Sequence, residues 1–266
     1  QTPEQITGTA SGVFRSSQFA RRLAESGVQV VVPVLLSRAS TFSGSAGMAD
    51  RGTWENPEPE ARWTNLPHRE WIYRQAFEMG RHPIGLEVQK IYSAIDWFEQ
   101  TDAATPIGVA GYGEGGLLAL YAAAVDERID AALVSGYFGP REDLWQEPVY
   151  RNVWGLFKQF GDAEIASMIA PRNLIIEYSE VPAVDGPPPA EENERAAAAP
   201  GSLRTPAFES VADEVERLRA FFPENAEVQS EVQFVHGTDG ETVGPGSEEA
   251  LTTFLGAFGT DLHENG

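Results

Sequence analysis

The clearest indication of chemistry is a glycine cluster, GYGEGG, at residues 111–116. It fits G-x-S-x-G, a strained turn between a strand and a helix that holds a serine nucleophile above a sheet, where the next N–H helps to bind the oxyanion. Gly113 takes the serine position here, so the nucleophile slot is empty. Because loss of a triad nucleophile lowers kcat about a millionfold, we do not expect simple serine-ester chemistry at this turn.

The same cluster also fits the dinucleotide fingerprint G-x-G-x-x-G, through Gly111, Gly113 and Gly116. Such a site holds a pyrophosphate at a helix N-terminus and uses an acidic residue about 20 positions further on to hold the ribose. No Asp or Glu lies between Asp130 and Glu142, where the next strand would end. We therefore expect no cofactor and favour the nucleophile-elbow interpretation over the dinucleotide one.

Other side chains near such a turn could take part in chemistry. Glu114 is placed at a helix N-terminus, where the helix dipole stabilises a carboxylate, but it could also act over the cleft as a general acid or base. Ser135 and Ser179 each follow a predicted strand and could be displaced nucleophiles, although most serines at strand ends only bond the backbone. His236, in FVHGTDGE, is either a base at a strand end or a solvent-exposed residue that opens a glycine loop.

Metal chemistry is not indicated by the metal-ligating residue types. The chain has no cysteine, which excludes thiolate ligands, disulfides and cysteine nucleophiles. His68 and His82 are fourteen residues apart, far from the i, i+4 spacing of a helical zinc pair, and His263 lies in the C-terminal tail. The charged neighbours of His68 and His82 instead predict a salt-bridged, partly buried helix face.

Composition and charge narrow the classes of partner. A net charge of −21 disfavours phosphate backbones and anionic lipid, so we expect neither a nucleic-acid nor a membrane partner. No run approaches the roughly 18 apolar residues that span a bilayer, and no signal segment opens the chain. Because Gln1 is not an initiator methionine, we expect a soluble, processed chain or a fragment. The sequence leaves the localisation open, with a secreted or periplasmic location after processing as one option.

Apolar patterning predicts alternating strands and helices around the cluster. Continuous apolar runs predict parallel strands at residues 28–36, 106–110, 129–134, 173–178 and 231–235. Helical spacing predicts helices at residues 19–25, 68–99 with a break near Pro83, 117–125, 211–222 and 247–258. Residues 180–206, with three consecutive prolines and a run of four alanines, predict a mobile, irregular loop. The aromatic-rich residues 145–160 predict core packing or a lid.

Two stretches resemble a known superfamily. GVAGYGEGGLLALYAAAVDERIDAALVSG, from Gly108, resembles the α/β-hydrolases, especially their acetyl xylan esterase and dienelactone hydrolase-like branch. GRHPIGLEVQKIYSAIDWF, from Gly80, is similar to the helix that precedes the elbow in those esterases. The resemblance covers residues 17–180 best. It implies an α/β fold with a mostly parallel sheet flanked by helices on both faces, in a single domain over residues 1–266 that lacks the family's N-terminal strands.

The resemblance also implies a set of site positions. Gly113 takes the nucleophile slot, Glu180 or Asp185 takes the acid slot, and His236 takes the base slot. It implies a homologue of carboxylic-ester hydrolases that act on acylated carbohydrates or similar small esters, with the serine lost. A non-catalytic member that uses the cleft to bind a ligand or partner is the main alternative, and a dinucleotide-binding protein is the third. The oligomeric state is not indicated.

Overall fold

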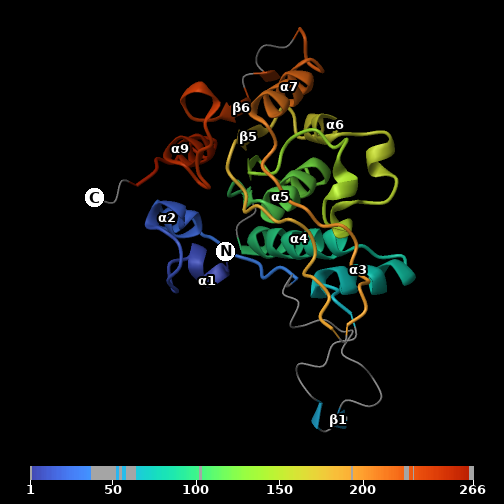
Figure 1. Ribbon diagram of the computed structural model, residues 1–266. Coiled ribbons are helices and arrows are strands. Elements are labelled where there is room, and N and C mark those ends of the chain that lie inside the picture. The colour runs from blue at the N-terminus through green and yellow to red at the C-terminus, as the bar shows by residue number, and fades with distance from the viewer. Residues whose placement is uncertain are drawn as a thin grey trace.

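The centre of the computed structural model is a parallel sheet whose strands run in the order β3-β4-β5-β6 (Figure 1). The structure describes residues 2–36, 52–53, 56–57, 64–101, 104–192, 194–224, 228–229 and 231–263. The strands are β3 (Gly108–Tyr112), β4 (Ala131–Ser135), β5 (Asn173–Glu177) and β6 (Val232–Val235). Tyr112 pairs with Ser135, and Ser135 with Glu177, so the carboxyl ends of three neighbouring strands meet at one edge. Sites of α/β folds form at this edge.

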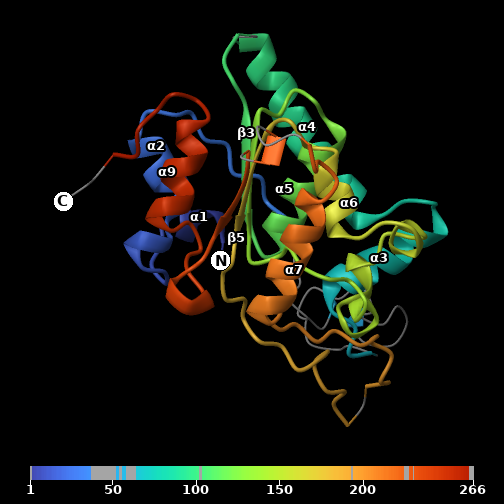
Figure 2. The same ribbon diagram turned by 90° about the horizontal axis from the view of Figure 1, so that it is seen from above.

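Helices cover both faces of the sheet (Figure 2). One face packs on α2 (Phe19–Glu25) and α9 (Glu248–Gly256), and the other on α4 (Pro83–Thr101), α5 (Glu114–Val125), α6 (Asp162–Ser167) and α7 (Phe208–Arg219). Strand alternation separates the two cores, because Leu133 of β4 packs with α9 while Val134 packs with α5. The α/β fold with helices on both faces, expected from the sequence, is confirmed.

The other described elements lie outside this sandwich. They are α1 (Pro3–Ile6), α3 (His68–Glu78), the antiparallel pair β1 (Gly52–Thr53) and β2 (Asn56–Pro57), and the 3₁₀ turns η1 (Arg15–Ser17), η3 (Leu144–Gln146), η4 (Val149–Arg151), η5 (Leu156–Lys158) and η6 (Thr238–Gly240). The described part of residues 180–206 contains neither helix nor strand and runs from β5 past α3 to α7 (Figures 1 and 2). Within the described residues, no helix combines the length and apolar character needed to cross a membrane.

The predicted strand at residues 28–36 is wrong. The segment joins no ladder among the described residues, and two of its apolar side chains, Val31 and Val34, are 44% and 66% exposed. Its last N–H, at Leu36, donates to the carboxylate of Glu87 at 2.7 Å instead of to a neighbouring strand. β-Branched residues are favoured where side chains pack on a half-buried sheet surface. Their presence does not by itself provide a neighbouring strand to pair with.

Close packing of β3 on α5 explains part of the glycine cluster. A Cβ at Gly111 would overlap the carbonyl oxygen of Gly115, and a Cβ at Gly116 would lie 2.8 Å from the carbonyl oxygen of Ser135. In contrast, a Cβ at Gly115 would meet no atom within 4 Å. Two of these glycines are therefore required by backbone contact of α5 with the strands before and after it, β3 and β4, whatever chemistry the turn performs.

This packing predicts opposite outcomes for two matched substitutions. We expect Gly111→Ala to lower the free energy of unfolding by about 3 kcal/mol, because the added methyl group must displace backbone. We expect Gly115→Ala, in the first turn of α5, to be neutral or to stabilise by up to about 1 kcal/mol. Urea unfolding followed by circular dichroism measures both values. Equal effects of the two substitutions would contradict the packing argument.

Candidate active site

The chain turns from β3 into α5 at Gly113, at the carboxyl edge of the sheet. Its φ of 56° and ψ of −111° lie outside the regions that residues with side chains prefer. The Gly113 N–H donates to the carbonyl oxygen of Ser135 at 2.9 Å, which fixes the turn against β4. A Cβ at Gly113 would meet no atom within 4 Å. The backbone path of a nucleophile elbow is thus formed, with room for a side chain at the position that lacks one.

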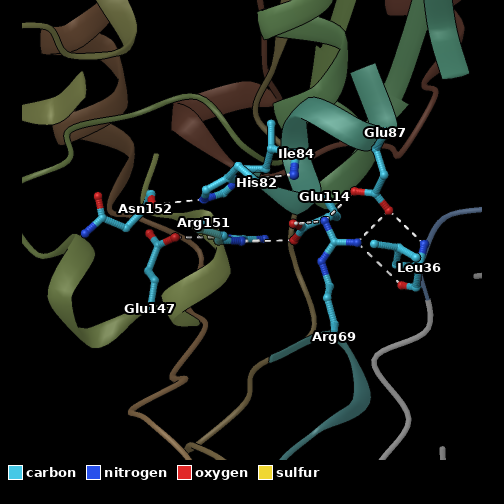
Figure 3. A network of polar contacts seen from close by, with 9 residues as sticks. All are labelled: Leu36, Arg69, His82, Ile84, Glu87, Glu114, Glu147, Arg151 and Asn152. Atoms are coloured by element: carbon cyan, nitrogen blue, oxygen red, sulfur yellow. Dashed lines mark hydrogen bonds and ion pairs between the residues drawn. The ribbon is translucent and has the colours of Figure 1, made fainter. Parts of the chain in front are cut away.

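Glu114, the first residue of α5, is held between two arginines (Figure 3). Its Oε1 accepts from Arg69 Nη2 at 3.2 Å, and its Oε2 accepts from Arg151 Nε at 3.1 Å. The Arg69 side chain is fully buried, and those of Arg151 and Glu114 are less than a tenth exposed. The carboxylate therefore lies at the positive end of α5 with a cation on each side.

The ion pairs continue on both sides of Glu114. Arg69 forms a bidentate pair with Glu87 of α4, and Arg151 Nη1 donates to Glu147 at 3.0 Å. Burial by itself would lower the pKa of both arginines, but the neighbouring carboxylates outweigh it and raise each pKa above its ordinary value. Negative and positive groups thus alternate along a buried row that joins α4, α3, α5 and the 3₁₀ turn η4.

His82 lies beside this row and links α4 to the segment that carries Arg151 (Figure 3). Its Nδ1 accepts from the Ile84 N–H at 3.2 Å, and its Nε2 donates to the carbonyl oxygen of Asn152 at 3.1 Å. These contacts require a neutral ring with the proton on Nε2. Burial lowers the pKa of His82, against a raising effect of the Asn152 carbonyl, and the charge of Arg69 lowers it further.

The acid and base positions implied by the resemblance have different partners in the structure. The side chain of His236 is exposed, and its Nδ1 donates to the carbonyl oxygen of Gly237 at 2.8 Å. Its ring packs on Phe208, with the two ring centroids 4.8 Å apart. Glu180 is exposed, and the carboxylate of Asp185, 98% exposed, pairs with Arg204. Among the described residues, no hydrogen bond or ion pair joins His236 to either acid.

A third carboxylate, Glu177, ends β5 beside Val235 of β6 but lies on the other face of the sheet. It is 2% exposed and accepts from the N–H groups of Gly246 and Ser247 at 2.9 and 2.7 Å, so it holds the N-terminus of α9. His236 packs on the face that α7 covers, through Phe208. Strand alternation therefore directs Glu177 and His236 to opposite sides.

The two serines proposed as displaced nucleophiles are both buried. Ser135 is 2% exposed, and its Oγ donates to the Glu177 carboxylate. Ser179 is 1% exposed. A nucleophile must reach the carbonyl carbon of its substrate, so neither serine is placed for attack in this conformation. Over the described residues, no cluster of His, Asp and Glu side chains is arranged to hold a metal ion.

Sequence reasoning identified the elbow and missed what surrounds it. A salt-bridged helix face around residues 68–87 was predicted and is confirmed by the pair of Arg69 with Glu87. The contact of Glu114 with Arg69 spans 45 residues and that with Arg151 spans 37, and neither has a periodic signal in the sequence. The buried role of Glu177 could have been suspected from a charged residue that ends an apolar strand run.

Comparison with known proteins agrees with this geometry. The profile of the dienelactone hydrolase family matches residues 5–152, a range that contains the elbow. A search of curated proteins finds no match. One similar solved structure is that of a "putative acetyl xylan esterase" from Bacteroides fragilis, at 12% identity and a TM-score of 0.50, covering 99% of this chain. This chain covers 64% of that protein, less than two thirds of its length.

A glucuronoyl esterase from Solibacter usitatus is matched at 11% identity and a TM-score of 0.37, over 82% of this chain and 70% of that one. At these identities the Bacteroides structure shows a shared fold and nothing of a shared reaction, and the Solibacter structure carries no argument. The resemblance to a dienelactone hydrolase-like branch, stated from residues 80–136, is confirmed by the family profile.

The bridging role of Glu114 predicts a large loss of stability on its removal. We expect Glu114→Ala to lower the free energy of unfolding by about 3 kcal/mol, because two buried guanidinium groups lose the carboxylate between them. The control is Glu216→Ala, in which a 69% exposed carboxylate loses Arg219 at 2.8 Å and which should cost less than about 1 kcal/mol. Urea unfolding compares the two, and a smaller effect at Glu114 than at Glu216 would contradict the bridging role.

The contacts of His82 predict a pH dependence of stability. The folded protein binds a proton at His82 less readily than the unfolded chain does, because the pKa is lowered below 6.5. This contribution is complete above pH 6.5 and is lost as the pH falls through 6.5 toward the lowered value. We expect His82→Asn, which keeps a neutral acceptor, to remove it, and the control His263→Asn to leave it unchanged. Urea unfolding at several pH values tests this, and a loss at low pH that persists in His82→Asn would contradict it.

Proposed function

Because this chain belongs to the dienelactone hydrolase family, we propose that it binds a small ester or an acylated carbohydrate at the elbow without hydrolysing it. The proposal rests on the conformation, surroundings and identity of residue 113. The backbone has the strained conformation that presents a nucleophile, the space for a side chain is there, and the residue is glycine. An elbow with glycine at this position keeps the N–H of the following residue but lacks the group that forms the acyl-enzyme.

The environment of the other triad positions supports binding over catalysis. A serine nucleophile is activated by a base that a third group orients, and His236 has no carboxylate partner among the described residues. The alternative of a displaced nucleophile finds no support in Ser135 or Ser179, because both are buried. Glu114 is committed to two arginines and so is a poor candidate for a general acid or base.

The electrostatics of the elbow favour an uncharged ligand. The two arginines that contact Glu114, the residue after Gly113, are Arg69 and Arg151, and each is also bonded to a second carboxylate. An anionic ligand would meet this neutralised row and a chain of net charge −21. An ester or acetylated sugar needs only hydrogen bonds and apolar contact, and the esterase name of the Bacteroides relative supports this class.

The proposal predicts binding without turnover. With the wild-type protein we expect no hydrolysis of p-nitrophenyl acetate above the buffer rate and no labelling by a fluorophosphonate. Acetylated xylo-oligosaccharides should give saturable heat in calorimetry and release no acetate, and the deacetylated oligosaccharides are the control ligand. Release of acetate, or a fluorophosphonate label on the wild-type protein, would overturn the proposal.

Restoring the nucleophile tests whether His236 lacks an orienting acid. We expect Gly113→Ser to gain little activity, staying roughly 10⁴-fold below a complete triad, because a base without an orienting acid loses about that factor. The rate of p-nitrophenyl acetate hydrolysis measures this. Full esterase activity of Gly113→Ser would show that His236 is correctly oriented in solution and that only the nucleophile is missing.

A further inference from the structure

We propose that residues 180–206, here called the strap, close the mouth of the elbow and are latched in place by the side chains of Asn65 and Glu70. All strap residues except 193 belong to the described part of the structure. The strap leaves β5, passes α3 and returns to α7 (Figures 1 and 2). The inference concerns access to Gly113 and goes beyond the proposed binding function.

The latch consists of hydrogen bonds from two buried side chains to the strap backbone. Asn65 Oδ1 accepts from the N–H groups of Ala197 and Ala198 at 2.8 and 3.0 Å, and its Nδ2 donates to the carbonyl oxygen of Pro188 at 2.8 Å. The Glu70 carboxylate accepts from the Ala199 N–H at 3.0 Å. Asn65 and Glu70 are 5% and 4% exposed, and the strap supplies the partners of the buried amide and, together with Arg74 at 2.7 Å, those of the buried carboxylate.

Two further anchors attach the strap on either side of the elbow. The Ser202 N–H donates to the carbonyl oxygen of Gln146 at 2.8 Å, and the Tyr112 hydroxyl donates to that of Glu180 at 2.6 Å. With the latch, these anchors tie the strap to the end of β3, to the turn η3 and to the start of α3.

Three of the four anchors, Glu70, Gln146 and Tyr112, adjoin a residue of the elbow or of the ion-pair row. Glu70 follows Arg69, Gln146 precedes Glu147 of the ion-pair row, and Tyr112 precedes Gly113. Glu114, the residue after Gly113, is bonded directly to Arg69. It is linked to Glu147 through Arg151. The strap is therefore attached to all three elements that converge on Glu114, which places it across the approach to that point.

The composition of the strap suits a cover that opens. Three of its four latched residues are alanines, which are bound through their N–H groups and bury little apolar surface. Closure thus depends on a few hydrogen bonds, each of modest net strength, and a local opening leaves the core intact. The proline-rich part, at residues 187–189, cannot donate to a ladder and so does not commit the strap to the sheet.

The absence of cysteine from the chain allows a direct test of access. Gly113→Cys introduces a single thiol at the elbow, and its rate of reaction with a soluble maleimide reports how often the approach is open. We expect the added substitution Asn65→Ala to raise that rate by about tenfold or more, since it removes three hydrogen bonds to the strap. The matched control Asn173→Ala, at the opposite end of β5, should leave the rate unchanged.

Hydrogen exchange on the wild-type protein keeps the proposal testable if Asn65→Ala fails to fold. We expect the amides of residues 197–199 to exchange more slowly than in an unstructured peptide, and those of Ala197 and Ala198 to lose that protection in Asn65→Ala. Amides of residues 197–199 that exchange in the wild type as fast as in an unstructured peptide would show that the latch does not form. If Asn65→Ala removes the protection of these amides without a faster reaction of the thiol at residue 113, the strap does not cover the elbow. Either result overturns the proposal. Neither measurement uses a ligand, so both are independent of whether the binding function is correct.

Discussion

The buried carboxylate of Glu114 between Arg69 and Arg151 is the interaction on which the arrangement of this site depends. Two buried guanidinium groups near one helix end repel each other unless an anion separates them, because burial weakens screening by solvent. The same two cations require Glu87 and Glu147 on their outer sides. The positions of α3, α4 and η4 relative to the elbow therefore follow from charge alternation as much as from apolar packing.

The elbow shows that the shape of a catalytic turn can persist without its chemistry. Gly111 and Gly116 are needed because strand and helix backbones touch, and this requirement holds whether or not residue 113 carries a nucleophile. A side chain at Gly113 would have to accept a φ of 56°, and glycine adopts that conformation without strain. Replacing a nucleophile by glycine thus removes reactivity while leaving the fold free of the cost of the strained turn.

Local patterns in the sequence predicted the elements of the sandwich, and long-range contacts decided the rest. The helix at residues 19–25 and the strand at residues 173–178 were found from periodicity and apolar runs, because each buries a face in one of the two cores. The run at residues 28–36 has the composition of a strand, but a strand also needs a partner, which composition does not encode. The partners of Glu114 likewise lie 37 and 45 residues away, beyond any local pattern.

The missing acid and base pair has a physical reason in the alternation of β5 and β6. Glu177 is the carboxylate nearest in register to His236, since it pairs with Val235. It is directed toward α9, where two N–H groups and the Ser135 hydroxyl satisfy it, and turning it toward His236 would leave those donors buried without a partner. His236 is directed to the aromatic rings on the other face, which offer packing and no charge. A working triad on this scaffold would therefore require a carboxylate from outside β5. Among the described residues neither Glu180 nor Asp185, both exposed, bonds to His236, and the Asp185 carboxylate pairs with Arg204 of the strap instead.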